Sequence, residues 1–241
     1  MIDLHCHFLP GVDDGARTVQ EGLTLAAVAA ESGITTAVLT PHVYPGVYDN
    51  TLSTLLPRFV QFRADLEQAG IGLAVHLGGE VRLHPDVLDL MEAGELPSIG
   101  SLDGMQVILI ELPDGEIPRG ALTACRHFAD RGYRWLIAHP ERNKAVMRDP
   151  ASILPFCEAG ALLQLTAASI IGKFGLPALH TARYLLDHGL VSVIATDAHN
   201  LAFRPPRLRE AFEAIAEHYG HDTAQRLMVS NPGEIIASRT A

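Results

Sequence analysis

The first strand-like stretch of the chain carries two histidines whose spacing suits metal binding. His5 and His7 are two residues apart, and on an extended strand that spacing turns both imidazoles to one face while Cys6 points to the other. Asp3 could hold the imidazoles in position, and the acidic turn that contains Asp14 could add a carboxylate oxygen. Taken alone, the pattern fits either half a metal site or two ordinary strand histidines, because short motifs recur by chance.

Similar side chains recur where later predicted strands end. Apolar, largely β-branched stretches predict buried strands at 34–40, 73–77, 106–110, 134–138, 161–165 and 191–195. With the opening strand there are seven, and six of them end in potential metal ligands: His5 and His7, His42, Glu80, Glu111, His139, and Asp197 with His199. Each residue alone could be a solvated acid or a turn histidine. Together they predict a polynuclear metal centre.

The elements that must position these residues alternate along the chain. Apolar residues at helical spacing, with glycines after many of the segments, predict helices at 18–32, 52–69, 85–93, 121–131, 151–159, 177–187, 207–219 and 222–237. Strands that alternate with helices indicate an α/β fold with a parallel sheet, and no linker interrupts residues 1–241. We therefore predict a single domain, a closed or nearly closed seven-stranded (β/α) barrel. Active sites in such barrels lie at the carboxyl ends of the strands, where the candidate ligands fall.

Composition narrows the class of partner and the compartment. The formal net charge of −10 disfavours a nucleic-acid partner, and an anionic substrate would need a local positive centre such as bound metal. Three cysteines form no disulfide framework, and no basic and apolar leader precedes the first motif, so we expect the cytoplasm. No apolar run is long enough to span a bilayer, which excludes membrane insertion. Nothing in the helices predicts an oligomeric state.

A set of motifs along the chain resembles a known family. They are Asp-Leu-His-Cys-His at 3–7, Val-Asp-Asp-Gly at 12–15, Thr-Pro-His at 40–42, Gly-Gly-Glu at 78–80, Ile-Glu-Leu at 110–112, Ala-His-Pro-Glu-Arg at 138–142, Thr-Asp-Ala-His-Asn at 196–200 and Arg-Pro-Pro at 204–206. In order and spacing they resemble the polymerase and histidinol phosphatase (PHP) family of metal-dependent phosphoesterases, and within it the bacterial capsule-associated tyrosine-protein phosphatases. The resemblance implies a distorted seven-stranded barrel that is TIM-barrel-like and a trinuclear metal site.

Carried over position by position, the resemblance implies three ligand sets. The first is His5, His7, Glu80 and Asp197; the second shares Glu80 and adds Glu111 and His139; the third is Asp14, His42 and His199. Imidazole and carboxylate ligands suit manganese, iron or zinc without choosing among them, and the resemblance favours three Mn2+ ions. Arg142 and Arg204 follow two of the ligand motifs and could either pair with a phosphate or form rim salt bridges.

The resemblance implies a metal-dependent protein-tyrosine phosphatase that needs no protein nucleophile. Its expected partner is the phosphotyrosine-containing tail of a bacterial tyrosine kinase that controls capsule or exopolysaccharide biosynthesis. Two alternatives stay open. One is a small-molecule phosphomonoesterase acting on histidinol phosphate or a nucleotide, and the other is a metal-binding module without turnover, which the complete ligand set disfavours. The sequence identifies no general acid for the leaving group.

Overall fold

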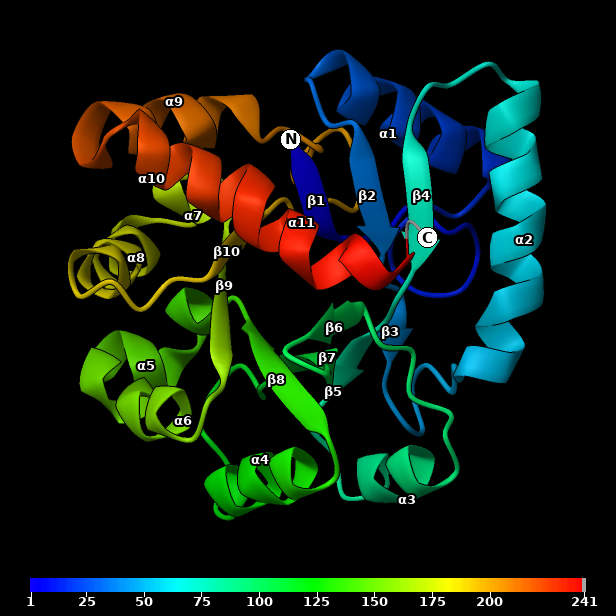
Figure 1. The fold of residues 1–241 in the computed structure, drawn as a ribbon. Helices are drawn as coiled ribbons and strands as arrows, with labels where there is room; N and C mark the ends of the chain where they lie inside the picture. The colour runs from blue at the N-terminus through cyan, green and yellow to red at the C-terminus, as the bar shows by residue number, and fades with distance from the viewer. Residues whose placement is uncertain (240–241) are drawn as a thin grey trace.

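The computed structural model describes residues 1–239 and shows strands surrounded by helices (Figure 1). The strands are β1 (Ile2–Cys6), β2 (Thr36–Leu39), β3 (His42–Val43), β4 (Ala74–Leu77), β5 (Glu80–Arg82), β6 (Gly100–Leu102), β7 (Met105–Glu111), β8 (Tyr133–Ala138), β9 (Leu162–Thr166) and β10 (Val193–Ala195). The helices are α1 (Val19–Glu31), α2 (Leu52–Gln68), α3 (Val87–Glu92), α4 (Ala121–Asp130), α5 (Lys144–Arg148), α6 (Leu154–Glu158), α7 (Ala167–Ile170), α8 (Leu176–Asp187), α9 (Arg209–Tyr219), α10 (His221–Gln225) and α11 (Asn231–Ile236). Short 3₁₀ turns cover Pro140–Arg142, Pro150–Ile153 and Ala237–Arg239, and a π-helical turn covers Arg226–Ser230.

The strands form two sheets that are parallel apart from one hairpin. One sheet has the order β1-β2-β4, and the other has the order β10-β9-β8-β7-β5-β3, with β6 paired antiparallel to β7. The segment after β10 lies beside β1, because Asp197 N donates to His5 O (2.8 Å) and His7 N donates to Ala198 O (2.8 Å). The predicted α/β class with parallel strands is confirmed.

Two predicted strands are interrupted and pass from one sheet to the other. The chain of β2 continues into β3 across Pro41, which has no N–H for the ladder, and β4 continues into β5 across Gly78 and Gly79. A Cβ at Gly78 would lie 2.8 Å from side-chain atoms of Val38 and Ile99, so the close approach of these chains requires glycine there. These breaks add β3 and β5, and the hairpin strand β6 brings the seven predicted strands to ten segments within residues 1–239.

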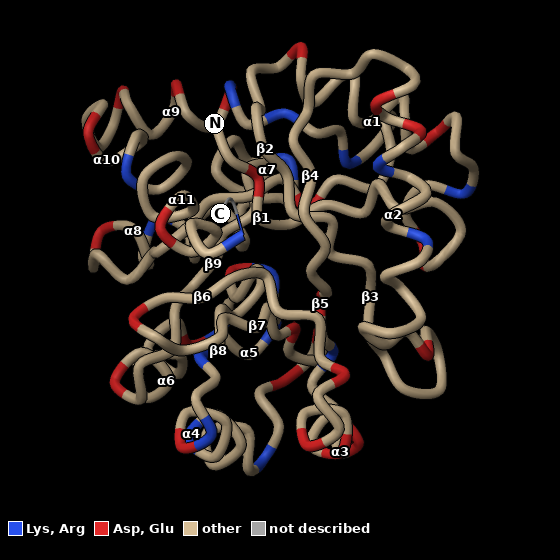
Figure 2. The backbone as a smooth tube through the Cα atoms, turned by 45° about the vertical axis from the view of Figure 1, so that its right-hand side comes forward, with Lys and Arg blue, Asp and Glu red and all other residues tan. Residues whose placement is uncertain are grey.

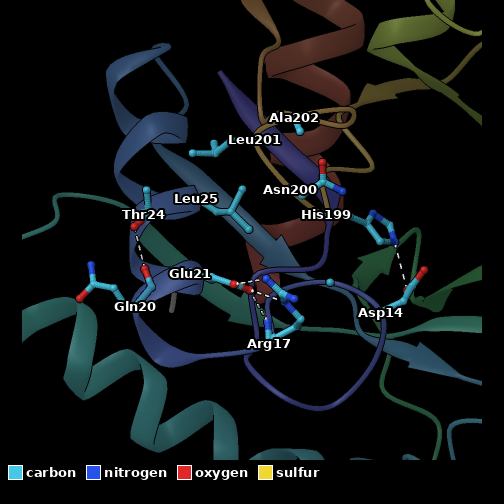
Figure 3. Close-up of a pocket in the computed structure, with 11 residues that line it drawn as sticks. Asp14, Arg17, Gln20, Glu21, Thr24, Leu25, His199, Asn200, Leu201 and Ala202 are labelled. Atoms are coloured by element: carbon cyan, nitrogen blue, oxygen red, sulfur yellow. Dashed lines mark hydrogen bonds and ion pairs between the residues drawn. The ribbon is translucent and has the colours of Figure 1, made fainter.

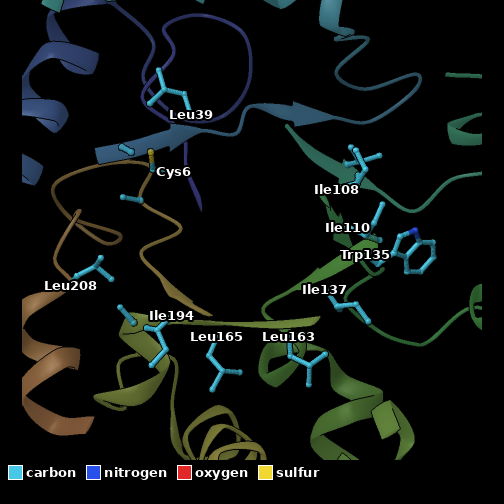
Figure 4. Close-up of a cluster of buried hydrophobic side chains, with 14 of the residues drawn as sticks. Cys6, Leu39, Ile108, Ile110, Trp135, Ile137, Leu163, Leu165, Ile194 and Leu208 are labelled. Atoms are coloured by element: carbon cyan, nitrogen blue, oxygen red, sulfur yellow. The ribbon is translucent and has the colours of Figure 1, made fainter. Parts of the chain in front are cut away.

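The apolar residues of the strands form two layers. Side chains such as Leu4, Val107 and Leu109 face an interior shared by both sheets, which Ile235 and Ile236 of α11 also enter. Alternate residues of the same strands pack outward against the helices, and Figure 4 shows them pointing away from the strands toward those helices. This inside and outside alternation is what buried strands of an α/β fold require.

Two predicted helices and one hairpin need correction. The predicted helix at 222–237 is divided into α10, the π-helical turn and α11, and the first third of the one at 151–159 belongs to a 3₁₀ turn. The hairpin of β6 and β7 was not predicted; its turn places Asp103 and Gly104 at positive φ, 52° and 79°.

Every helix within residues 1–239 is too short or too polar to cross a membrane. Figure 2 shows acidic residues on α3, α8 and α10, as the net charge of −10 leads one to expect.

Candidate metal centre

All nine predicted ligands meet where the strands end. They come from β1, the turn after it, β3, β5, β7 and the segments after β8 and β10: His5, His7, Asp14, His42, Glu80, Glu111, His139, Asp197 and His199. His139 directly follows β8, Asp197 lies two residues after β10, and both have positive φ, 31° and 52°. Such backbone strain in residues other than glycine persists where the surroundings impose it and clusters at functional sites.

Hydrogen bonds made by the Nδ1 atoms of His5 and His7 fix the orientation and tautomer of both imidazole rings. Gln164 Nε2 donates to Leu165 O (2.7 Å), so Gln164 Oε1 accepts a hydrogen bond from His5 Nδ1 (2.9 Å). His7 Nδ1 donates to Asp13 Oδ2 (2.7 Å), since a carboxylate can only accept. Both Nε2 atoms are thereby left to bind a proton or a cation, and partners of this kind typically orient metal-ligating histidines.

Four ligand atoms then converge on one point. His5 Nε2 and His7 Nε2 lie 3.2 Å apart, Glu80 Oε2 lies 3.2 and 3.3 Å from them, and Asp197 Oδ1 lies 3.3 and 3.5 Å from them. The side chains of all four residues are at most 2% exposed, and neither Glu80 Oε2 nor Asp197 Oδ1 has a hydrogen-bond partner within residues 1–239. Acceptors buried face to face need a cation between them, so these residues fit a divalent metal ion.

A second group surrounds Asp14, the most exposed of the predicted ligands. Asp14 Oδ1 lies 3.3 Å from His42 Nε2 and 3.4 Å from His199 Nε2, while His199 Nδ1 donates to the backbone oxygen of Asp197 (3.0 Å). Ligand atoms of His7, Asp14, His42 and His199 all lie within 4.8 Å of one another. The Asp14 side chain is 46% exposed, so this end of the cluster opens to solvent.

The third group contains the remaining ligands and is less sharply separated than the resemblance implies. His139 Nε2 lies 2.9 Å from Glu80 Oε1 and 4.0 Å from Glu111 Oε1. The ligand atoms of His42, Glu80 and Glu111 also lie within 4.8 Å of one another. His42 therefore stands between two groups, and Glu80 contacts His5, His42 and His139 at once.

The charges of this cluster shift its pKa values strongly. Burial would raise the pKa of Glu80, but the charges of His5 and His42 outweigh it and hold that pKa well below its usual range. Burial opposes protonation of His7, yet the neighbouring Asp13 carboxylate raises the pKa of His7 well above its ordinary value. Ionised Glu80 thus faces His5 and His7, whose pKa values are raised, and a cation can replace the protons that these two imidazoles hold, whereas burial lowers the pKa of His199 to about 4.

Three arginines surround the open side of the cluster, in a pocket of about 240 Å³ that Tyr44 and Tyr48 also line. Arg142 forms an ion pair with Asp197, and its guanidinium lies 4.5 Å from the centre of the Phe174 ring. Arg204 lies 3.5 Å from Asp14 Oδ2 and 3.6 Å from Asp197 Oδ2. Both arginines therefore form salt bridges, one of the two roles left open by the sequence, and both also line the pocket that a phosphate would enter.

Some residues of the site were missed by the sequence analysis. Arg82 pairs with Glu111 (2.9 Å) and lines the pocket; its position two residues after Glu80 on a strand was the signal that it shares a face. Asp13 and Gln164, which orient His7 and His5, were also missed, although Gln164 is a polar residue in an apolar strand.

Asp3 supports His5 through the backbone rather than through a ring nitrogen. It accepts hydrogen bonds from the backbone N–H (2.9 Å) and hydroxyl (2.5 Å) of Thr196 and from the backbone N–H of His5 (3.3 Å). It therefore joins β1 to the end of β10. Cys6 is fully buried and its thiol lies 3.5 Å from Val38 O, away from the ligands, as predicted.

The turn that carries Arg142 is held by a buried acid. Glu141 is fully buried, and its Oε1 accepts hydrogen bonds from Thr166 N (3.0 Å) and Ser169 Oγ (2.7 Å). These bonds tie the 3₁₀ turn after β8 to the junction of β9 and α7. Because Glu141 lies between His139 and Arg142 in the chain, these hydrogen bonds help to hold both residues in position.

The amino-acid sequence is similar to those of proteins named tyrosine-protein phosphatases. The chain is 33% identical to tyrosine-protein phosphatase YwqE of Bacillus subtilis (strain 168) over 222 residues, 92% of this chain and 86% of that protein. It is 30% identical to tyrosine-protein phosphatase CpsB of Streptococcus pneumoniae, with 98% of each chain covered.

The fold is similar to those of several solved structures. A structure from a study of YwqE from Bacillus subtilis and CpsB from Streptococcus pneumoniae, described as unique metal-dependent tyrosine phosphatases, matches with a TM-score of 0.91 and 32% identity over 98% of this chain and 94% of that one. Organophosphorus hydrolase from Deinococcus radiodurans shares the fold at 14% identity and a TM-score of 0.57, with 98% of this chain and 92% of that one covered. The family described as capsular polysaccharide synthesis, CpsB/CapC, matches residues 1–237, and the chain belongs to that family.

Proposed function

We propose that the protein is a metal-dependent protein-tyrosine phosphatase that hydrolyses phosphotyrosine at a trinuclear metal centre. The observation that carries the proposal is the convergence of buried acceptor atoms from His5, His7, Glu80 and Asp197, next to a pocket that three arginines line. The names of the relatives, which describe metal-dependent tyrosine phosphatases, support the same activity.

Ligand assignment follows the three groups of the site. We assign His5, His7, Glu80 and Asp197 to one cation, Glu80, Glu111 and His139 to a second, and Asp14, His42 and His199 to a third. Four carboxylates against three divalent cations leave a charge of about +2, which attracts a phosphate dianion. When bound, the cations would lower the pKa of a water molecule toward neutrality and so supply the nucleophile.

The protein's own groups bind and orient the phosphate. Arg142 and Arg204 present guanidinium groups at the pocket, where each can exchange a carboxylate partner for phosphate oxygens in a bidentate contact. Burial of His5 and His7 keeps the inner part of the centre dry, while the exposed side of Asp14 leaves room for a peptide to approach. Ser, Thr and Cys nucleophiles are not required in this scheme, and buried Cys6 takes no part.

The finer elements of the proposal concern metal, partner and fold. We propose Mn2+ as the metal, the phosphotyrosine-containing tail of a bacterial tyrosine kinase in capsular or exopolysaccharide biosynthesis as the substrate, and the cytoplasm as the compartment. The capsular polysaccharide synthesis family supports the choice of partner. We also propose that the two sheets together form the distorted, TIM-barrel-like barrel of the PHP family, with each interrupted strand counted once.

The test compares substrates and metals on purified protein. We expect hydrolysis of a phosphotyrosine peptide with added Mn2+, its loss after chelation by EDTA, and its return when Mn2+ is restored. Elemental analysis should find about three metal ions per chain. A large preference for histidinol phosphate or a nucleotide over the peptide would favour the small-molecule alternative. Failure to hydrolyse either these substrates or p-nitrophenyl phosphate would leave only a binding module.

A further inference from the structure

A second pocket opens beside the metal centre and is distinct from the pocket that the three arginines line. It has a volume of about 480 Å³ and lies between the first part of α1 and the segment 199–202 (Figure 3). Asp14 and His199 line this pocket and also belong to the predicted ligand set, so the pocket begins at the metal centre itself. The scheme described above leaves this volume unused.

One wall of the pocket is formed by the loop 199–204, which is held closed by hydrogen bonds between its own residues. His199 N donates to Arg204 O (3.0 Å), and Phe203 N donates to Asn200 Oδ1 (2.8 Å). Within this closed loop Leu201 lines the pocket with its side chain 47% exposed, and neighbouring Phe203 is 84% exposed. Leu201 and Phe203 thus present exposed apolar side chains at and next to the rim of the pocket.

The opposite wall, at the start of α1, carries no net charge. Arg17 and Glu21 at the start of α1 pair with each other through Nη2 and Oε1 (2.7 Å), as Figure 3 shows. Leu25 of the same helix is buried and Thr24 turns its hydroxyl to the backbone oxygen of Gln20 (2.7 Å). The pocket therefore suits an apolar side chain, whereas the arginine-lined side suits the phosphate.

We infer that this pocket binds an apolar side chain that flanks the phosphotyrosine in the substrate peptide. The inference rests on the proposed function, because a phosphotyrosine held at the metals places its peptide at the edge of the pocket. An extended peptide advances about 3.3 Å per residue, so a neighbouring side chain comes within reach of a pocket that shares Asp14 and His199 with the centre. The pocket is thus a specificity site for the peptide sequence.

The experiment uses matched phosphopeptides and p-nitrophenyl phosphate, which has no flanking residue. Peptides that carry Leu or Ala at the position before the phosphotyrosine, or at the position after it, are compared on the wild-type protein. At one of these two positions the Leu peptide should have a kcat/KM about 10-fold higher than the Ala peptide. Thr24→Trp, which fills the pocket from α1, should lower the ratio of peptide to p-nitrophenyl phosphate kcat/KM about 10-fold and abolish the preference for Leu. Leu201→Ala should reduce that preference without filling the pocket.

Leu56→Ala is the control, since Leu56 on α2 is 48% exposed, like Leu201, and lines neither pocket. It should behave as wild type with every substrate. Equal hydrolysis of Leu and Ala peptides by the wild-type protein, or a Leu preference that survives Thr24→Trp, would overturn the inference while the phosphatase activity stood. Absence of any phosphopeptide hydrolysis, with p-nitrophenyl phosphate still cleaved, would overturn the proposed function and the inference with it.

Discussion

Replacement of Asp13 by Asn tests whether the hydrogen bonds behind the ligands control metal binding. The Asp13 side chain is fully buried and accepts three hydrogen bonds, from His7 Nδ1 (2.7 Å), Gly15 N (2.9 Å) and His42 N (3.0 Å). An Asn amide has the same shape but only one acceptor oxygen. In either orientation its NH2 group faces at least one of these N–H donors, so at least one hydrogen bond is lost.

The expected loss of affinity follows from a weaker hydrogen bond to His7, because even the amide orientation that keeps this bond replaces a charged acceptor with a neutral one. Hydrogen bonds to charged groups are worth about 1.5–3 kcal/mol, and about 1.4 kcal/mol changes an equilibrium constant tenfold. We therefore expect Asp13→Asn to weaken metal binding about 10- to 100-fold, in the range typical for partners of metal-ligating histidines. The variant should regain most of its activity when Mn2+ is raised in proportion, because the ligands themselves are intact.

The assay titrates metal-depleted protein with Mn2+ and follows both p-nitrophenyl phosphate hydrolysis and bound metal. Asp149→Asn is the matched control, because exposed Asp149 accepts a hydrogen bond from Ala151 N (3.2 Å) and contacts no ligand. Equal Mn2+ affinity in Asp13→Asn and wild type would refute the reasoning. Lost activity that excess Mn2+ does not restore would also contradict it, since a reorientation of His7 acts through metal affinity.

Three further predictions concern the site and one concerns the core. His139→Ala should lower kcat/KM at least about 100-fold with an unchanged circular dichroism spectrum, whereas His127→Ala on α4 should have no effect; unchanged kinetics in the first variant would refute the ligand assignment. Metal binding at pH 7 should release protons, because the metal-free protein holds the pKa of His7 above its ordinary value, and affinity should therefore fall as pH falls; calorimetry in buffers of different ionisation enthalpy measures the release, and a heat independent of buffer contradicts it. Arg142→Ala should raise KM and lower kcat with metal content preserved, so loss of a full metal equivalent in elemental analysis would show a structural role instead. Leu109→Ala, in the interior between the sheets, should reduce the free energy of unfolding by about 2–5 kcal/mol in denaturant titrations, and a cost below about 1 kcal/mol would contradict a packed interior there.

The convergence of the candidate ligands could be predicted because it depends only on where the strands end. Parallel strands deliver their carboxyl ends to one edge, so a histidine or carboxylate after each apolar run converges with the others whatever the order of the strands. His5 and Glu80 are 75 residues apart in the chain and 3.2 Å apart in the structure for this reason. The grouping of ligands around each cation was not accessible in this way, because it depends on side-chain directions that the strand pattern leaves open.

The partners of the ligands could not be predicted because they depend on pairing between strands. Gln164 reaches His5 across the interior from β9, and nothing in the sequence around either residue identifies the other. The hairpin of β6 is different, since Asp103 and Gly104 form a typical hairpin turn and the signal was overlooked. Contacts between residues far apart in the chain therefore could not be predicted from the sequence pattern, whereas the local hairpin turn could have been.

Glu80 shows how far the site depends on an irregular backbone. A regular continuation of β4 would keep this residue in the sheet of β1 and β2, but the chain crosses at Gly78 and Gly79 to pair with β3 and β7. A Cβ at Gly79 would lie 2.4 Å from the ring of Pro97, so only glycine permits that passage. Because the crossing carries Glu80 between His5 on one sheet and His139 on the other, the break in the strand is what allows a single carboxylate to serve two groups of ligands.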